Sequence, residues 1–512
     1  MSLTTLDFIV IVAYLLGMAL IGLYFAQRQT SRDEYFLGGR RTHWLLAGGS
    51  ILATLLSSIS YLSLPGEMIR YGFGFFAGVL SVPLVVPLMN STLLPALKRL
   101  PITSVYEYLE RRFDGQVRTL TGSIFLVRTL LWMGLIIYTA SFAMVEVTGW
   151  NVYTTILVIG VITTFYTSAG GLQTVIWTDN LQLLILFGGA VAIPVYIGLT
   201  IGQGPMEWWS SFSQAGRGEI AAFSWDPMVR ITLFGALMSQ FFWNVCTQGS
   251  DQVAVQRLLS TPSLKEAQRS LWVYAAANVV LLFFLAICGL ALFAYYAHES
   301  GLPMQAFQEQ VAPEADKLMP RFIVQVLPSG VSGLLVAALL AAAMSSLSSG
   351  INSISSVISS DFLNRQSGEG ESLWFDRFSG IAAGLAGVAM ACLITLAMQT
   401  SDWNLVELTG RVNHIFVGPI GVLFFAGILI RRAGKSAGLA GFVGGTAISL
   451  YICFGKEWFG LEESVSFLWV VPASFVGGLL ISLLVSLMGQ PPPEEKVRGL
   501  TYPISSSSGG GD

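Results

Sequence analysis

Long apolar segments recur along the whole chain, and most charged residues lie between them. A membrane-spanning helix needs about 20 mainly apolar residues. Thirteen stretches approach or exceed that length: 7–27, 44–70, 72–97, 119–148, 152–170, 175–202, 229–250, 271–297, 324–357, 378–398, 406–430, 436–455 and 467–488. Hydrophobic residues make up 54% of the chain and charged residues only 11%. Because a backbone in lipid must satisfy its own hydrogen bonds, we expect an all-α, multi-pass integral protein of an inner or plasma membrane.

The connections between these segments differ in their content of lysine and arginine. If the N-terminus lies outside, most of the 27 lysines and arginines fall on the cytoplasmic side, among them Arg28, Arg257 and Lys265. Arg128 falls inside a span. The positive-inside rule therefore predicts an N-terminus outside and a C-terminus inside.

One apolar segment contains a cluster of hydroxyl groups. Residues 335–361 are rich in Ala and Leu, but Ser345, Ser346, Ser348 and Ser349 lie at its centre. The spacing i, i+1, i+3, i+4 gathers most of these side chains on one side of a helix. Small oxygen ligands can replace the hydration shell of a sodium ion, or small serines can simply let helices approach closely.

Two further segments are interrupted in the middle. The second segment reads GGSILATLLSSISYLSLPGEMIRYG, with Pro65 and Gly66, and the seventh reads FFWNVCTQGSDQVAVQR. Five spans separate their starts, which fits two five-helix repeats of opposite orientation. Transporters with inverted repeats bind solutes and ions where such helices break, although Pro and Gly also produce ordinary kinks.

Two charged residues inside spans are candidates for function, because such residues are costly in a membrane. Asp179 is a possible cation ligand, and its alternative is a cap near the interface. Arg128 could neutralise an anionic substrate or extend its side chain to the interface.

Four motifs resemble one family of transporters. GGLQTVIWTD, DQVAVQR, AAAMSSLSSGINS and ATLLSSISYLSLPGEMIRYG are similar to signature stretches of the sodium:solute symporter family, and the resemblance covers residues 7–455. It implies a leucine-transporter-like five-plus-five inverted repeat with about 13 helices. The expected parts are an extra N-terminal helix and loop (1–43), the first repeat (44–202), an external loop (203–228), the second repeat (229–430), two extra C-terminal helices (431–489) and a disordered cytoplasmic tail (490–512).

The resemblance also implies two sets of sodium ligands. The general site maps to carbonyls and hydroxyls of Ala53, Leu56, Ala342, Ser345 and Ser346. A second site, found in some members, maps to Asp179, Ser345, Ser348 and Ser349. Two sodium ions per cycle are therefore expected.

The solute site matches the family less well. Expected solute-binding positions are Ser57, Ser60, Arg128, Trp132, Asn244, Thr247 and Gln248. Trp132 stands where sialic acid transporters have an arginine, and Arg128 lies one turn away. The resemblance thus favours a carboxylate, a sialic acid or a sugar without choosing among them.

The sequence analysis as a whole predicts a secondary active transporter that couples inward sodium movement to uptake of a small organic solute by alternating access. Proton coupling, a sodium-conducting channel and a sensor with a transporter-like fold are the alternatives. No cluster of His, Cys or carboxylates predicts an enzyme, and no organic cofactor or nucleic acid is expected. The partners are sodium, the solute and the lipid bilayer; a monomer suffices for transport, and the oligomeric state stays open.

Overall fold

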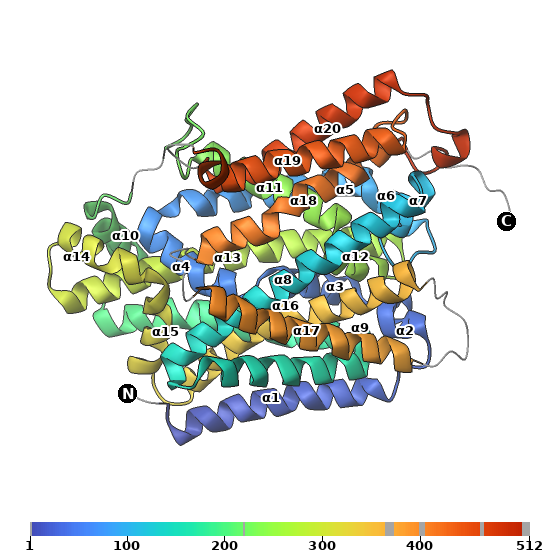
Figure 1. Ribbon diagram of the computed structural model, residues 1–512. Helices are drawn as coiled ribbons and strands as arrows, with labels where there is room; N and C mark the ends of the chain where they lie inside the picture. The colour runs from blue at the N-terminus through green and yellow to red at the C-terminus, as the bar shows by residue number, and fades with distance from the viewer. Residues whose placement is uncertain (1–2, 219–220, 364–372, 399–404, 461–464, 504–512) are drawn as a thin grey trace.

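The computed structural model (Figure 1) describes residues 3–218, 221–363, 373–398, 405–460 and 465–503. Over these ranges the chain is helical and contains no strand. Nine described helices are long and apolar enough to span a membrane, or ten if one bent pair is counted as a single span. The expectation of a multi-pass, all-α membrane protein is confirmed.

The helices follow the apolar segments of the sequence. The N-terminal part contains α1 (Thr5–Ala26), α2 (Arg32–Leu37), α3 (Trp44–Leu55), α4 (Ser58–Tyr71), α5 (Val82–Ser91), α6 (Leu93–Lys98), α7 (Glu107–Arg112), α8 (Gly115–Thr148), α9 (Val152–Ile201) and α10 (Pro205–Gln214). The rest contains α11 (Leu233–Ser250), α12 (Gln252–Leu259), α13 (Leu264–Ser300), α14 (Met304–Val311), α15 (Ala315–Gln325), α16 (Val331–Val357), α17 (Trp374–Met398), α18 (Leu405–Leu429), α19 (Lys435–Phe459) and α20 (Val470–Met488). Short 3₁₀ helices include Phe73–Ser81 and Phe467–Trp469.

One long helix explains part of the difference between nine or ten spans and the thirteen expected. The 50-residue α9 covers two predicted segments, and Gly171 interrupts it with a φ of 63° and a ψ of −160°. An L side chain rarely adopts this φ, and a Cβ there would lie 2.6 Å from the Tyr35 carbonyl oxygen. The count of thirteen, the orientation and the repeat boundaries stay predictions.

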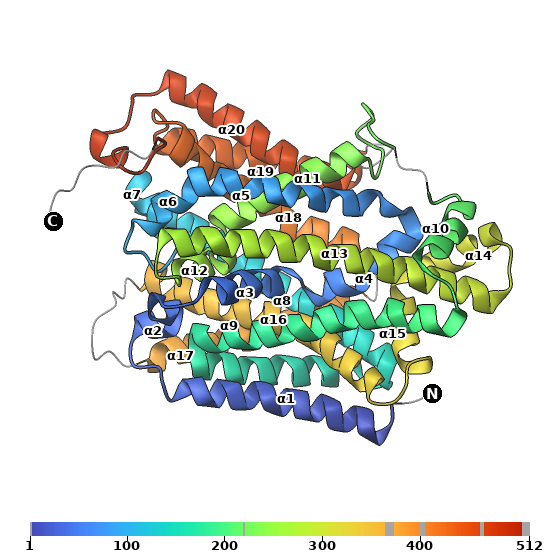
Figure 2. The same ribbon diagram turned by 180° about the vertical axis from the view of Figure 1, so that it is seen from behind.

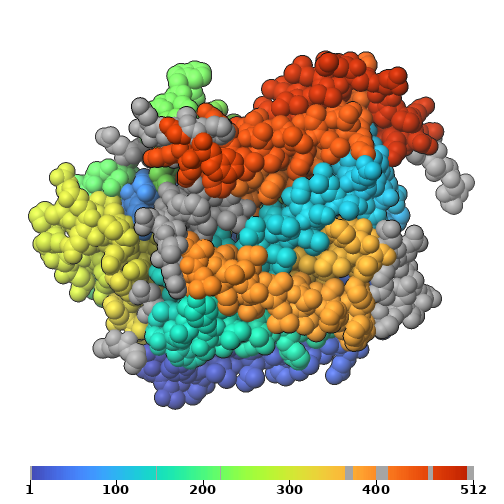
Figure 3. Space-filling model, viewed as in Figure 1, coloured from blue at the N-terminus to red at the C-terminus, as the bar shows by residue number. Residues whose placement is uncertain are grey.

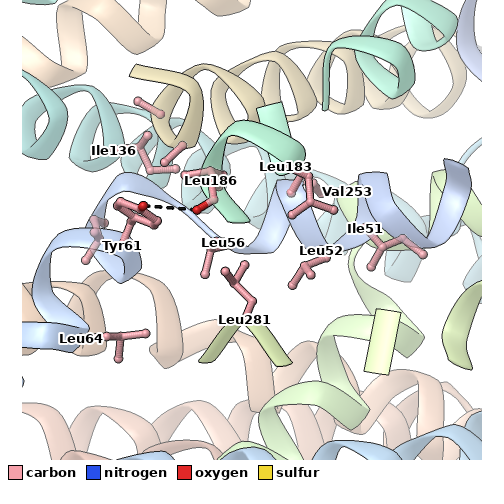
Figure 4. Packing of buried hydrophobic residues seen from close by; sticks show 14 of the residues in the cluster. Ile51, Leu52, Leu56, Tyr61, Leu64, Ile136, Leu183, Leu186, Val253 and Leu281 are labelled. Carbon is pink, nitrogen blue, oxygen red and sulfur yellow. Dashed lines mark hydrogen bonds between the residues drawn. The ribbon is translucent and has the colours of Figure 1, made fainter. Parts of the chain in front are cut away.

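Both segments that were predicted to be interrupted contain a break between helices, but the first break precedes Pro65 and Gly66, which lie inside α4. The axes of α3 and α4 meet at 65°, because Leu56 and Ser57 adopt extended backbone conformations. Asp251 is likewise extended and separates α11 from α12. Figure 4 shows the first break between Leu52 and Tyr61, where the Tyr61 hydroxyl donates to the Leu186 carbonyl over 3.2 Å.

The hydroxyl-bearing helix α16 lies in the interior of the bundle. It packs against α1, α8, α9 and α17, and its serines Ser345 to Ser349 are fully buried. Asp7, near the start of α1, accepts hydrogen bonds from the amides of Gly330 (2.7 Å) and Gly333 (2.8 Å). These bonds satisfy free donors at the N-terminus of α16. In the view of Figure 3, α1 forms the lower edge of the molecule and α19 and α20 the upper edge.

The C-terminal segment corrects one prediction. The Tyr502 amide donates to the Ile428 carbonyl over 2.8 Å. The Tyr108 hydroxyl donates to the Leu500 carbonyl over 3.0 Å, and Lys496 donates to the Phe113 carbonyl over 2.6 Å. The expectation of a disordered tail from Gln490 is therefore wrong for residues 490–503, because backbone groups of this segment bond to the helical bundle. Residues 504–512 lie outside the described part.

Candidate functional site: an ion and solute site at two helix breaks

Hydroxyls of α16 meet carbonyls that the α3–α4 break leaves free. Since Ser57 is extended, the amides after Leu56 no longer serve the last carbonyls of α3. The Ser345 hydroxyl donates to the Ala53 carbonyl over 2.9 Å, and the Ser346 hydroxyl donates to the Thr54 carbonyl over 2.7 Å. Oxygen atoms from two distant helices are thereby held together in a fully buried place.

The structure brings most of the predicted general sodium site together. Ser345 also lies 3.3 Å from the Ala342 carbonyl oxygen on its own helix. Leu56 ends α3 at the break, and its side chain faces the adjoining cavity. Ser346 contacts the carbonyl of Thr54, a residue that the sequence analysis did not name.

The predicted second site is centred on Asp179 of α9. Its Oδ2 accepts hydrogen bonds from Ser50 (2.6 Å) and Thr54 (3.3 Å), and Thr54 in turn lies 2.7 Å from the Ser349 hydroxyl. Asp179 Oδ1 is buried and has no hydrogen-bond partner in the described part of the chain. A carboxylate oxygen without a partner, next to three hydroxyls, is a potential cation ligand.

In the described part of the chain, no hydrogen bond joins the three serines of the predicted second set to this carboxylate, and Ser349 reaches it only through Thr54. The Ser348 hydroxyl donates to the Ser345 carbonyl over 2.9 Å, and the Ser345 hydroxyl bonds to Ala53. Ser50 and Thr54 occupy the positions nearest to Asp179 instead. Ser50 and Thr54 are spaced i and i+4 on α3, the helix whose carbonyls face α16. This spacing could have identified them as members of the site.

Arg257 is a site residue that the sequence analysis placed wrongly. It was expected among the cytoplasmic loop charges, but its side chain is fully buried. Its guanidinium lies 3.5 Å from Asp179 Oδ2, and it donates to the hydroxyls of Ser50 (3.0 Å) and Ser349. The cause is that the DQVAVQR motif forms α12 inside the bundle. The guanidinium thus pairs with the carboxylate of the predicted second cation site.

A cavity adjoins the α3–α4 break on the other side. The volume of this cavity is about 180 Å³. Of the predicted solute-binding residues, Ser57, Ser60, Arg128, Trp132 and Thr247 line it. Asn244 and Gln248 do not line it. Asn244 instead accepts a hydrogen bond of 2.5 Å from the Tyr274 hydroxyl, and Tyr274 does face the cavity.

Arg128 is the cation that lines this cavity. It is 6% exposed, so the alternative of an extended side chain at the interface is wrong. It pairs with Asp251 over 2.5 Å and donates to Asn413 Oδ1 over 2.9 Å. Asp251, which also caps α12 through the Val253 amide at 3.0 Å, was absent from the predicted site because it lies far from Arg128 in sequence.

Glu67 and Arg230 form a second charged pair at this cavity. Glu67 of α4 is 1% exposed and pairs with Arg230 over 3.2 Å. Arg230 lies over the rings of Tyr71 (4.2 Å) and Phe467 (5.3 Å). Phe467 comes from the 3₁₀ helix before α20, so one of the extra C-terminal segments contributes to the cavity wall. The sequence analysis missed this contribution.

The ligand types define which ions the site suits. Hydroxyls, carbonyls and one carboxylate are hard oxygen donors, which bind alkali and alkaline-earth cations. The described residues include no group of three or more His, Cys, Asp or Glu side chains that could hold a metal ion. The arrangement fits a monovalent cation better than a divalent or transition metal.

These breaks and oxygen sites define a leucine-transporter-like secondary transporter, and solved structures support that class. The structure of a Na⁺-coupled sialic acid symporter, substrate-bound and outward-open, matches with a TM-score of 0.83 and 29% identity, covering 95% of this chain and 99% of that one. Mhp1, a nucleobase-cation-symport-1 family transporter, shares the fold with a TM-score of 0.54 at 14% identity and coverages of 90% and 94%.

The sequence comparisons name the family. The model of the sodium:solute symporter family matches residues 35–445. The sodium/sialic acid symporter NanT of Aliivibrio fischeri is 32% identical, with 88% of each chain covered. The sodium-coupled monocarboxylate transporter 1 of Homo sapiens is also 32% identical, over 88% of this chain and 73% of its own length. The chain belongs to the sodium:solute symporter family, as its motifs predicted.

Proposed function

We propose that the protein couples inward sodium movement to the uptake of a small organic anion of the carboxylate or sialic acid class. The main observation is the pairing of Ser345 with the free carbonyl of Ala53 across the α3–α4 break. Oxygens from both halves of the chain meet there, so a cation bound between them would hold the two helices together. The relatives that transport sialic acids and monocarboxylates support the choice of solute.

Two sodium ions per cycle fit the two sets of oxygens. The first ion would bind Ala53, Leu56, Ala342, Ser345 and Ser346. The second would bind Asp179, Ser345, Ser348 and Ser349, with Ser50 and Thr54 at hand. Arg257 lies beside Asp179 Oδ2, so a sodium ion at the free Oδ1 would repel the guanidinium and favour its displacement from the carboxylate. When sodium has left, the Arg257 guanidinium would again neutralise the Asp179 carboxylate in place of the ion.

Arg128 is the proposed anchor for the solute carboxylate. A guanidinium presents a planar fork of donors that matches a carboxylate, and Trp132, Ser57 and Ser60 supply the neighbouring wall of the cavity. Asp251 already pairs with Arg128, so a solute carboxylate would compete with Asp251 for this guanidinium.

The short helix α12 links the two events. Asp251 directly precedes α12 and pairs with Arg128, the proposed solute anchor. Arg257, near the C-terminal end of α12, pairs with Asp179 of the proposed second cation site. A solute that displaces Asp251 and a sodium ion that displaces Arg257 would act on the same rigid element. Reciprocal coupling of their affinities follows. With two sodium ions and a monovalent anion, one net charge crosses per cycle, and it gains roughly 2.3 kcal/mol per 100 mV.

Uptake into proteoliposomes tests the proposal. N-acetylneuraminate, lactate and glucose should each be offered with an inward sodium gradient, and with potassium at the same pH. An anion should accumulate only with sodium and should generate an inward current. Uptake in potassium driven by a pH gradient would replace the proposal by proton coupling, and sodium current without any solute requirement would replace it by a channel. Asp179→Ala should lower the Hill coefficient for sodium towards one.

A further inference from the structure

A long apolar groove opens on the surface that faces lipid, away from the solute cavity. Its volume is about 1160 Å³, and four helices form it: α1, α3, α9 and α13. Figure 2 shows these helices on one face of the molecule. The lining residues are Leu20, Ile21, Tyr24, Phe25, Arg28, Leu45, Leu46, Gly49, Trp177, Asn180, Leu181, Leu183, Leu184, Val273 and Ala277.

The walls of the groove suit hydrocarbon. Leu20 and Leu184 are 64% and 70% exposed, which is expected for side chains on the bilayer face of a span. The amide nitrogen of Asn180, a polar group in the wall, already donates to the carbonyls of Leu46 (2.9 Å) and Ile176 (2.7 Å). The long part of the groove therefore offers an occupant mainly apolar contact.

One end of the groove is basic. Arg28 lines it, and its guanidinium lies 4.2 Å from the centre of the Tyr24 ring. No carboxylate of the described residues forms an ion pair with Arg28 or with Lys265. Lys265 lies two helical turns, about 12 Å, before the groove residue Val273 on α13.

The two basic residues belong to the same end of the molecule. The Thr42 amide, just before α3, donates to the Ser260 carbonyl, just before α13, over 3.0 Å. The starts of α3 and α13 therefore lie close to each other, and the end of α1 lies at the same end of the molecule (Figure 2). The positive-inside prediction assigns this end to the cytoplasmic leaflet.

We propose that this groove binds one anionic phospholipid. An acyl chain lies along α1 and α9 between Leu184 and Ala277, and the phosphate of the headgroup contacts Arg28, while Lys265 adds positive charge at the same end of the molecule. Basic residues at one end and a continuous apolar wall match an amphiphile with an anionic head. A second copy of the chain would instead cover a broad apolar patch without requiring charge at one end.

Native mass spectrometry of the purified, delipidated full-length protein tests the site. The probes are phosphatidylglycerol and phosphatidylcholine with identical acyl chains, titrated separately. The wild-type chain should retain one phosphatidylglycerol under conditions that remove phosphatidylcholine. Arg28→Gln should weaken phosphatidylglycerol binding about fivefold, and the double variant with Lys265→Gln about 25-fold. Arg432→Gln removes an exposed arginine of the α18–α19 loop and should change nothing.

Filling the groove tests the position of the acyl chain. Ala277→Trp should abolish retention, whereas Ala276→Trp, at the exposed neighbouring position of α13, should not. Equal retention of both lipids by the wild-type chain, or unchanged binding by Arg28→Gln, would overturn the proposal, as would a dimer without lipid. Unfolding temperatures in detergent check that each variant is folded, and the Arg28 variants keep the test decisive if Ala277→Trp does not fold.

Discussion

The Arg128 guanidinium pairs with the Asp251 carboxylate across 2.5 Å in the wall of the cavity beside the α3–α4 break. This contact joins α8 to the break between α11 and α12. Arg257 lies six residues further along the chain and pairs with Asp179 at 3.5 Å. Two buried arginine–carboxylate pairs therefore flank the short helix α12. An anionic solute is proposed to bind Arg128 of the first pair, and a sodium ion is proposed to bind Asp179 of the second.

Replacing Arg128 tests the solute anchor. Arg128→Gln should raise the Kd for an anionic solute at least 30-fold, because truncating one partner of a buried charge pair costs roughly 2–5 kcal/mol. Sodium binding without solute, measured by thermal shift in sodium against potassium, should stay unchanged. Arg40→Gln, which breaks the partly exposed pair with Asp33, is the matched control. Wild-type solute affinity in Arg128→Gln would make the residue structural.

Asp251 should oppose solute binding. In Asp251→Asn the guanidinium of Arg128 loses its charged competitor, so an anionic solute should bind about tenfold more tightly, as expected when a charged hydrogen-bond partner is removed. Transport should become slower because release requires Arg128 to exchange partners. Isothermal titration gives the Kd, and counterflow gives the rate. Asp33→Asn is the control at the surface, and weaker solute binding in Asp251→Asn would contradict the competition.

The serines of α16 should differ in their effect on sodium. Ser345→Ala and Ser346→Ala each remove an oxygen that contacts a free carbonyl of α3, so the half-saturating sodium concentration should rise about tenfold. Ser355→Ala is the matched control on the same helix, since its hydroxyl bonds to Ser379 and to the Asp376 carbonyl. An equal rise in all three variants would indicate a packing role for the serines, the alternative that the sequence left open.

Lys98 gives a pH dependence outside the spans. Burial, with a contribution from the charge of Arg40, lowers the pKa of Lys98 to about 8. Its ammonium donates to the carbonyls of Leu259 and Thr261 at the end of α12. Between this pKa and the usual lysine pKa of 10.5, the unfolded state binds more protons, so the Lys98 contribution to stability rises with pH. The unfolding temperature of the wild-type chain should therefore gain on that of Lys98→Met between pH 8 and pH 10; a constant difference would exclude the effect.

The sequence predicted the elements that depend on local pattern. The lengths of the apolar runs predicted the helices, and the helical spacing of the hydroxyls predicted that Ser345 and Ser346 share one side of a helix. Both features can be read from neighbouring residues in the sequence. Polar, Gly and Pro residues within apolar runs predicted that two segments are broken, but they did not place the first break, since Pro65 and Gly66 lie inside α4. Contacts between residues far apart could not be read in this way.

The long-range contacts changed the interpretation of single residues. Arg257 resembles a loop charge in the sequence, and only the packing of α12 against α3 and α16 reveals its burial. Asp251 is 123 residues away from Arg128, so no spacing rule pairs them. Phe467 reaches the cavity because the segment before α20 folds over α11, where Ser466 donates to the Arg230 carbonyl over 2.6 Å.

Arg257→Met tests the stand-in role of the guanidinium. Without it, Asp179 is a buried carboxylate with no cation, which should cost about 3–5 kcal/mol in the absence of sodium. Sodium should recover much of this loss, because the ion would neutralise the carboxylate. The shift in unfolding temperature between potassium and sodium should therefore be larger in Arg257→Met than in the wild-type chain, and the larger shift should disappear in Asp179→Asn/Arg257→Met. An equally small shift in the wild-type chain and in Arg257→Met would mean that sodium does not bind Asp179. The pair between Arg257 and Asp179 would then be a structural contact of α12.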